Sequence, residues 1–95
     1  MISFTVRIRF AAEDRAEIAE VLRNLTLASR QEPGCVNYIA HQVEGDPETV
    51  LIYEQYESQE ALNAHRESDH FKKYAVGGLY QKMRERAVEN LNALV

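Results

Sequence analysis

Residues 35–56 read CVNYIAHQVEGDPETVLIYEQY and contain two predicted β-strands. Cys35 to Val43 and Thr49 to Tyr56 are both rich in β-forming residues, and Gly45-Asp46-Pro47 between them is typical of a turn. Two such strands around a short turn form a hairpin. Apolar side chains occupy both alternating sets of positions, so both faces of the resulting sheet must be covered.

The residues before the hairpin predict a strand followed by a helix. From Ile2 to Phe10 every second residue is apolar, which is the period of a strand with one buried face. We expect a helix from Asp14 to Gln31, because apolar residues return every three or four positions and Pro33-Gly34 stops it. Asp14 and Glu17 have the spacing of a capping box at its start.

The residues after the hairpin predict further helices and a last strand. Two serines mark helix starts, and Gly77-Gly78 is expected to interrupt the second of these helices. The expected segments are a helix from Ser58 to about Arg66, a short helix from Asp69 to Val76 capped by Ser68, a helical stretch from Leu79 to Arg86, and a strand from Arg86 to Val95.

The order of these segments is β-α-β-β-α-β, which is the split βαβ or ferredoxin-like arrangement of the α+β class. The 95 residues fit one domain, spanning residues 1–95. The helices can cover one face of the sheet. Too few elements remain to cover the other face, so we expect a homodimer that joins two sheets face to face.

The charge and composition exclude several classes of partner. The net charge is −4 and no cluster of Lys and Arg offsets it, so we expect neither nucleic acid nor a membrane surface as a partner. No apolar run is long enough to span a bilayer, and the N-terminus lacks the pattern of a signal peptide. Cys35 is the only cysteine, which rules out an internal disulfide and favours a cytoplasmic location.

His65 and His70 are the candidates for acid–base chemistry, because histidine titrates near neutral pH. Their i, i+5 spacing, with a helix break between them, differs from the i, i+4 spacing of two metal ligands on one helical face. His41 on a strand could join them in a three-histidine metal site. No carboxylate pattern supports that site, so we expect no metal, and a structural role is an equal alternative for each histidine.

Tyrosine, glutamate and cysteine supply the remaining candidates. The chain has five tyrosines, which suit either the core or the wall of a pocket for a flat aromatic ligand. Glu54 stands between apolar neighbours in the second hairpin strand, and a buried ion pair with Arg7 or Arg9 is expected in preference to a role as base. Cys35 follows a Pro-Gly turn into a strand, where a packed and unreactive thiol is the usual outcome.

Several short motifs are spread along the chain: Glu32-Pro33-Gly34-Cys35 leading to Tyr38, then Tyr53-Glu54-Gln55-Tyr56, Ala61-Leu62, His65 and Ser68-Asp69-His70-Phe71. Together they resemble the antibiotic biosynthesis monooxygenase domain family, which includes quinol monooxygenases. With the alternating first strand, the likeness covers nearly the whole chain. The resemblance implies a ferredoxin-like subunit that forms a dimeric α+β barrel, with a pocket between sheet and helices in each subunit.

Members of this family oxidise phenolic or quinol-type compounds with dioxygen and without flavin, metal or haem, whereas others degrade haem or isomerise a phosphorylated signal. The haem degraders carry a tryptophan at the place of His65 and a histidine close to Ala75, and this sequence has no tryptophan. The resemblance therefore favours a cofactor-independent monooxygenase that oxidises a small quinol or polyphenol with dioxygen. The alternatives are an isomerase of a small phosphorylated signal molecule and a non-catalytic ligand-binding or stress-response barrel.

For a monooxygenase, His65 is the first choice of base and His70 the second. His65 follows an apolar stretch and could face the pocket, and His70 lies in a first helical turn, where the helix dipole favours the neutral imidazole. The expected substrate-binding residues are Tyr53 and Tyr74, which would orient the ligand, Glu54, which would hold an arginine or a histidine tautomer, and His41.

Overall fold

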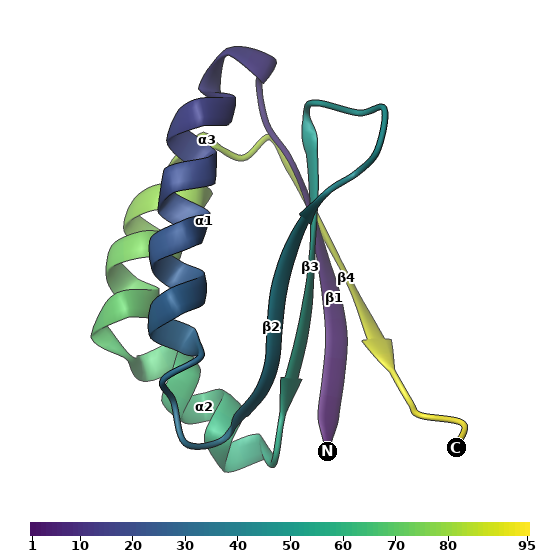
Figure 1. The fold of residues 1–95 in the computed structure, drawn as a ribbon. Helices are drawn as coiled ribbons and strands as arrows, with labels where there is room; N and C mark the ends of the chain where they lie inside the picture. Colours follow the sequence, from purple (N-terminus) through teal and green to yellow (C-terminus); the bar gives the residue numbers. More distant parts are fainter.

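A four-stranded antiparallel sheet carries all the helices on one face in the computed structural model, which describes residues 1–95 (Figure 1). The strand order is β2-β3-β1-β4, which confirms the predicted ferredoxin-like α+β fold. The elements in chain order are β1 (Ile2–Arg9), η1 (Ala12–Asp14), α1 (Arg15–Ser29), β2 (Cys35–Gln42), β3 (Thr49–Tyr56), α2 (Gln59–Glu67), the π-helical η2 (Phe71–Leu79), α3 (Tyr80–Lys82) and β4 (Glu85–Leu91).

The core lies between the sheet and the helices, and β1 runs through its centre. Phe4, Val6 and Ile8 are each at most 5% exposed, because alternate side chains of β1 point toward the helices. Burying one such side chain is worth about 1.5–3 kcal/mol. The α1 residues that belong to the same buried cluster follow helical spacing: Ile18, Leu22 and Leu25.

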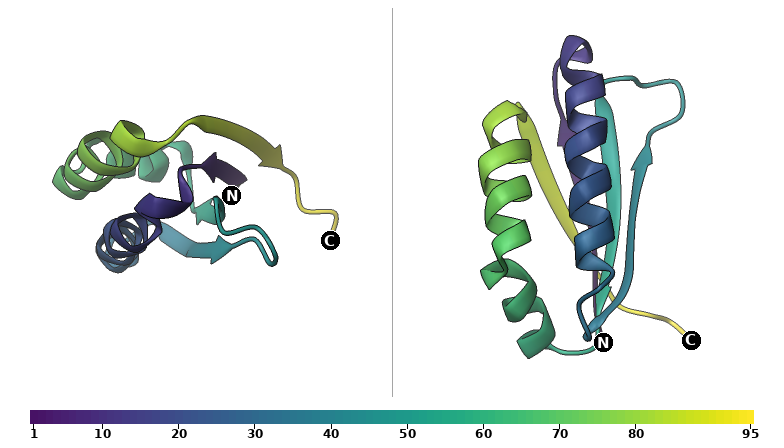
Figure 2. Two further views of the ribbon diagram at one scale, coloured as in Figure 1. Left: turned by 90° about the horizontal axis from the view of Figure 1, so that it is seen from above. Right: turned by 60° about the vertical axis from the view of Figure 1, so that its left-hand side comes forward.

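The opposite face of the sheet has no helix over it, as the view from above shows (Figure 2). Along β3, Ile52 and Glu54 are buried toward the helices, whereas Leu51 and Tyr53 lie on the open side. Ile39 pairs with Tyr53 across the hairpin and is 39% exposed. Apolar residues on both faces of the sheet are therefore confirmed, and the second subunit expected over the open face stays a prediction.

The two serine caps are found where the sequence placed them. Ser58 Oγ accepts a hydrogen bond from the backbone N–H of Ala61 at 3.1 Å, at the start of α2. Ser68 Oγ accepts one from the N–H of Phe71 at 3.2 Å, just before η2. Each bond satisfies a helix-start N–H that would otherwise lack a partner, so the two helices begin at defined residues.

Three features of the helices differ from the predictions. Asp14 makes no capping bond and lies 3.8 Å from Lys82 Nζ instead. The helical segment η2 does not break at Gly77-Gly78. A Cβ on Gly78 would lie 2.9 Å from Val21 Cγ1, so the glycine lets η2 pack closely on α1. The helical stretch ends at Lys82 rather than Arg86, because β4 pairs with β1 from Glu85 onward. No helix has both the length and the apolar character that a membrane crossing requires.

Candidate functional site

Glu32 joins two histidines at one end of the sheet. It lies in the turn between α1 and β2, where its N–H donates to Ser29 O and its carbonyl accepts from Cys35 N–H, both at 3.1 Å. The side chain points to α2 and to the start of the next helix. Its Oε2 lies 2.8 Å from His65 Nδ1 and also contacts His70 Nε2. Glu32, His65 and His70 are called the histidine cluster below.

His65 is the most buried member of this cluster. It projects from the last turn of α2, and its side chain is 3% exposed. The ring packs against the rings of Tyr56 and Phe71, with centroids 5.1 and 5.2 Å away. Burial lowers the pKa of His65, and the hydrogen bond to the Glu32 carboxylate partly opposes that shift. The imidazole is therefore neutral at physiological pH and oriented by Glu32 through Nδ1.

Glu54 lies on the other side of the His65 ring. Its Oε1 is 3.8 Å from His65 Nε2 and accepts a hydrogen bond of 2.7 Å from the hydroxyl of Tyr56. Burial raises the pKa of Glu54 to about 7, although the bond from Tyr56 lowers it. A carboxyl group with a pKa near neutrality can exchange protons at physiological pH.

The predicted ion pair between Glu54 and Arg7 or Arg9 is wrong. Phe4, Val6 and Ile8 point toward the helices, so the odd-numbered arginines of β1 lie on the open face. Arg9 pairs instead with Glu85 at 2.8 Å and with Glu48 at 3.7 Å. The cations that act on Glu54 are Arg66 and Arg86, which lower its pKa from the helix-covered side.

A small cavity adjoins His65 and Glu54. Its volume is about 40 Å³, and 11 of its 15 lining residues are hydrophobic. Phe71 and Tyr80 meet edge to face at one side, with ring centroids 6.1 Å apart. The full lining is Phe4, Val6, Ile8, Leu25, Tyr38, Ile52, Glu54, Leu62, His65, Arg66, Phe71, Ala75, Leu79, Tyr80 and Arg86. The site thus combines an apolar wall, two arginines and an oriented imidazole.

The other candidates from the sequence are distributed differently. The side chain of His70 is 23% exposed, and His70 is in the histidine cluster but does not line the cavity. Tyr53 lies on the open face of the sheet, and Tyr74 is half-buried outside the cavity lining. His41 is exposed, and its Nδ1 lies 3.2 Å from the carbonyl oxygen of Leu51. The structure brings together only His65, His70 and Glu54 from the predicted set.

The Cys35 thiol is half-buried at the start of β2. Burial, with the nearby Glu32 carboxylate, raises its pKa to about 11. The thiol is protonated at neutral pH and makes only a 3.7 Å contact with the carbonyl of Asn37. Burial and the carboxyl groups of Glu32 and Glu54 outweigh the nearby Arg30, so this environment agrees with the expected packed thiol and not with an activated nucleophile.

Glu32 is the central residue of the cluster, and the sequence analysis named it only as part of a family motif and not as a candidate site residue. The position of Glu32 in the sequence nevertheless gives an indication of its role. Glu32 follows the end of α1 by three residues, and a carboxylate near a helix C-terminus is disfavoured by the helix dipole. An acidic residue at this disfavoured position, just before a Pro-Gly stop, favours a partner for the carboxylate elsewhere in the fold.

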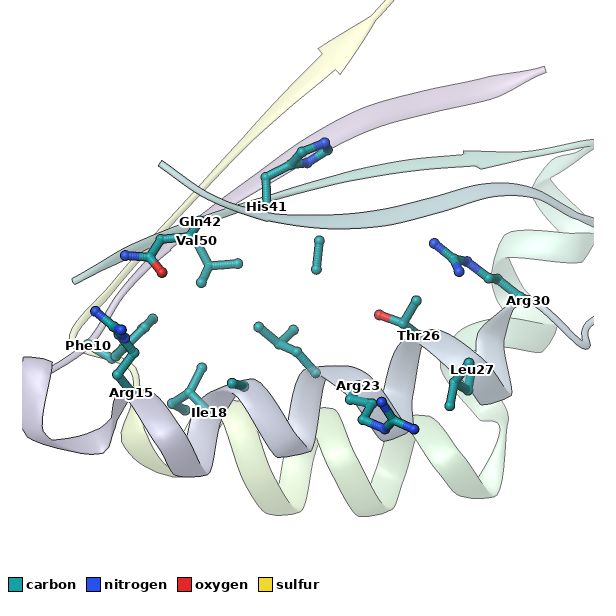
Figure 3. Close-up of a pocket in the computed structure, with 13 residues that line it drawn as sticks. Phe10, Arg15, Ile18, Arg23, Thr26, Leu27, Arg30, His41, Gln42 and Val50 are labelled. Carbon is teal, nitrogen blue, oxygen red and sulfur yellow. The ribbon is translucent and has the colours of Figure 1, made fainter. Parts of the chain in front are cut away.

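A second, larger cavity is a separate groove between α1 and β2 (Figure 3). It has a volume of about 400 Å³ and an apolar floor that includes Phe10, Ile18 and Leu22. Arg15 and Arg30 extend toward β2 at its two ends, and the ring of His41 points away from α1 (Figure 3). We call it the arginine groove, and its full lining is Phe10, Arg15, Ile18, Ala19, Leu22, Arg23, Thr26, Leu27, Arg30, Ala40, His41, Gln42 and Val50.

Comparison with known proteins identifies relatives of this fold. The sequence profile described as antibiotic biosynthesis monooxygenase matches residues 1–76. No protein with a curated description matches the sequence. A conserved protein of unknown function from Bacteroides thetaiotaomicron is 28% identical, with 95% of this chain and 94% of that chain covered and a TM-score of 0.87.

Two further solved structures are similar along almost the entire chain. A Pseudomonas aeruginosa protein is 26% identical over 99% of this chain and 94% of its own, with a TM-score of 0.89. A protein described as an antibiotic biosynthesis monooxygenase is 23% identical over 100% of both chains, with a TM-score of 0.92. At that identity the last likeness supports the fold alone.

Proposed function

The chain belongs to the antibiotic biosynthesis monooxygenase family, and from that premise we propose that it is a cofactor-independent monooxygenase of a small quinol or polyphenol. The observation that carries the proposal is the buried His65, whose Nδ1 is held by Glu32 at 2.8 Å. His65 also lines the cavity between sheet and helices. An oriented, neutral imidazole at an apolar cavity is the arrangement that proton abstraction from a phenol needs.

The position of the ring proton decides which nitrogen of His65 can act as the base. The Glu32 carboxylate accepts the Nδ1–H of His65, which leaves the lone pair of Nε2 free on the side of Glu54 and the cavity. When Nε2 takes a proton from the substrate, the resulting imidazolium lies against the Glu32 carboxylate and is stabilised there. Glu32 is therefore a positioning residue and His65 is the base of the proposed reaction.

The substrate itself supplies the electrons in this chemistry. Proton transfer to His65 gives an electron-rich phenolate, which reduces dioxygen and then combines with it at a ring carbon as a hydroperoxide. Loss of water leaves a hydroxylated quinone, so that one quinol and one dioxygen give one hydroxyquinone and one water. The protein has to bind the ring, remove the proton and stabilise the anion. Arg66 and Arg86 in the cavity lining are suited to the last task.

The cavity must enlarge to admit a substituted ring. Its volume of about 40 Å³ is far below the ~300 Å³ at which ligand pockets begin. The side chains that would move are Phe71 and Tyr80, on the helical segment that runs through Gly77-Gly78. A π-helical stretch such as η2 is found frequently at functional sites. We therefore place substrate entry on the side of Phe71 and Tyr80.

Oxygen uptake with a panel of quinols and anthrones tests the function. We expect consumption of dioxygen with at least one compound, and incorporation of one oxygen atom from labelled dioxygen into the product. His65→Gln should abolish most of this uptake while its thermal unfolding remains cooperative. Failure of the wild-type protein to consume dioxygen with any compound of the panel would remove the proposal.

A homodimer is part of the same proposal. The open face of the sheet carries Ile39, Leu51 and Tyr53, and no element of this chain covers them. Contact between two such faces would bury these residues and close the barrel that the family implies. Analytical ultracentrifugation at micromolar concentration should give a dimer, and Tyr53→Arg should shift it to monomer. A stable wild-type monomer would contradict the expected assembly.

The arginine groove favours one alternative function. Three arginines and no acidic residue line it, so it suits a phosphorylated small molecule, such as the substrate of a signal isomerase. The groove has no base directed into it, because the ring of His41 points away from α1 (Figure 3). Retention of a phosphorylated sugar in equilibrium dialysis, without oxygen uptake from any quinol, would favour this alternative.

A further inference from the structure

We infer that the histidine cluster binds a divalent transition-metal ion of the Zn²⁺ type, with His65 Nδ1, His70 Nε2 and a Glu32 carboxylate oxygen as ligands. These three atoms lie within 4.8 Å of one another. Two imidazole nitrogens and one carboxylate form a donor set that zinc and its neighbours in the transition series prefer over magnesium or calcium. The inference goes beyond the proposed function, in which no metal takes part.

The cluster is compact enough for one small ion. Zinc–ligand bonds of about 2.0–2.2 Å in a tetrahedral site place the ligand atoms about 3.3 Å apart. His65 Nδ1 and Glu32 Oε2 are already 2.8 Å apart, so a movement of well under 1 Å between them suffices. The ion would replace the protons that now hold Glu32 to the two imidazoles.

Glu32 has an unused donor atom in the cluster. Its Oε1 is buried without any hydrogen-bond partner. A buried carboxylate oxygen without a partner is uncommon, because it has lost its hydrogen bonds to water and gained none in return. A cation shared between the two oxygens of Glu32 would make up for that loss, and this is the second observation that favours a ligand here.

The surroundings of His65 resemble the outer shell of a metal site. A histidine that binds metal through one nitrogen almost always donates its other N–H to a carboxylate, a carbonyl or water. His65 Nε2 lies 3.8 Å from Glu54 Oε1, so the acceptor stands on the correct side. The side chain of His70 is 23% exposed, which leaves a path for the ion from solvent.

This ligand set differs from the three-histidine site considered from the sequence. His41 is absent from the cluster and bonds to the Leu51 carbonyl, so Glu32 takes its place. The carboxylate that the spacing of the histidines did not reveal comes from the turn after α1. The metal site is therefore assembled from three separate segments of the chain.

Metal binding would stop the proposed reaction rather than assist it. With the ion on Nδ1, the proton of the neutral imidazole resides on Nε2, and Nε2 can no longer accept a proton from the substrate. Bound metal and free base are thus mutually exclusive states of His65. Binding itself does not depend on the proposed function, whereas this inhibition rests on it.

Titration of the protein with Co²⁺ tests the binding, because tetrahedral Co²⁺ with nitrogen ligands gives visible ligand-field absorption. We expect saturation at one equivalent per chain and displacement of the absorption by Zn²⁺. His70→Asn and Glu32→Gln should each weaken Co²⁺ binding by at least about tenfold. His41→Asn is the matched control and should bind as the wild type does.

Two outcomes would overturn the inference. One is the absence of ligand-field absorption in the wild-type protein at equimolar Co²⁺. The other is equal binding by the wild type and by His70→Asn, whose own fold is checked by its thermal unfolding in the presence of a chelator. Excess Zn²⁺ should also suppress oxygen uptake, with recovery on adding a chelator. A protein that never consumes dioxygen but gives the absorption would retain the metal site and lose the proposed function.

Discussion

The histidine cluster and the arginine groove differ in almost every physical property. The cavity beside the cluster has a volume of about 40 Å³ and the groove about 400 Å³. The imidazole of His65 in the cluster is buried between the carboxyl groups of Glu32 and Glu54, whereas the arginines of the groove are exposed. Cavity volume alone would therefore favour the groove as the functional site, whereas acid–base chemistry favours the cluster.

Chain topology explains the difference. The cluster and the neighbouring Glu54 bring together side chains from the turn after α1, the end of β3 and the region around α2, which all meet at one end of the sheet. Groups from separate segments can be packed tightly and desolvated there, which is what shifts a pKa. The groove is the space between one helix and an edge strand, so its cations stay in contact with water. Burial, and not size, distinguishes the reactive region.

Removal of the imidazole should have the largest effect on activity. A general base contributes about 10²–10⁴ in rate, so His65→Ala should lower kcat for quinol oxidation by that factor. Arg84→Gln, an exposed arginine outside both regions, is the control and should keep wild-type turnover. Steady-state oxygen uptake measures both variants. A His65→Ala protein that is folded and fully active would assign the chemistry to some other part of the molecule.

The pH dependence of stability should reveal the buried carboxyl group. The pKa of Glu54 is raised from 4.5 to about 7, so the folded state binds the extra proton between these values. Its contribution is fully present below about pH 4.5 and is lost as pH rises through about 7, a change of about 2–4 kcal/mol. Glu54→Gln should remove this loss, because an amide has no charge to bury.

Urea unfolding at pH 5 and pH 8 gives the free energy of unfolding of the wild type and of Glu54→Gln, and the difference between the two proteins at each pH measures the contribution of Glu54. His65, whose pKa is lowered by burial, contributes with the opposite sign, so the wild type is compared with the variant at each pH and not with itself at two pH values. Glu54→Gln should be the more stable protein at pH 8. Equal stability of the two proteins at that pH would show that Glu54 is ionised in the fold at little cost.

A close contact between the Glu32 turn and α2 should control the geometry of the cluster. A Cβ on Gly34 would lie 2.4 Å from the Cβ of Ala61, which is too short for two carbon atoms. Gly34→Ala must therefore push α2 away from the turn, at a cost of about 1–3 kcal/mol in stability. His65 moves with α2, so turnover should fall as well.

The double variant Gly34→Ala with Ala61→Gly is the matched control, because it restores the space on the other side of the contact. Thermal unfolding and oxygen uptake should both recover relative to Gly34→Ala alone, beyond the small loss expected from a glycine in a helix. Additive losses in the double variant would show that the contact does not position the cluster.

Local sequence patterns were sufficient for the fold but only partly for the site. The alternation in β1, the hairpin and the serine caps are properties of neighbouring residues, and the structure has them where they were expected. The failures concern contacts between distant segments. Asp14 pairs with Lys82, and Gly77-Gly78 serves the approach of η2 to α1, neither of which a local pattern contains.

The same distinction applies to the candidate residues. His65, His70 and Glu54 were found by residue type and neighbours, whereas Glu32 acquires its role from contacts 33 and 38 residues away. Tyr53 shows the limit of residue type alone, since the period of the strand places it on the face opposite to Glu54. The alternation of the strand alone already predicts that Tyr53 and Glu54 lie on opposite faces of the sheet.

The groove should give the smallest effects. Its arginines are exposed, so each contributes about 0.2–1 kcal/mol to holding an anion, or about a 1.4- to 5-fold change in affinity. Arg15→Gln should weaken the binding of phenyl phosphate by a factor in this range, and added salt should weaken it in the wild type as well.

Arg84→Gln is the charge-matched control. Isothermal titration calorimetry measures the affinities, and oxygen uptake should stay within twofold of wild type. A loss of turnover in Arg15→Gln as large as that in His65→Ala would reverse the comparison, because the larger cavity would then be the reactive one.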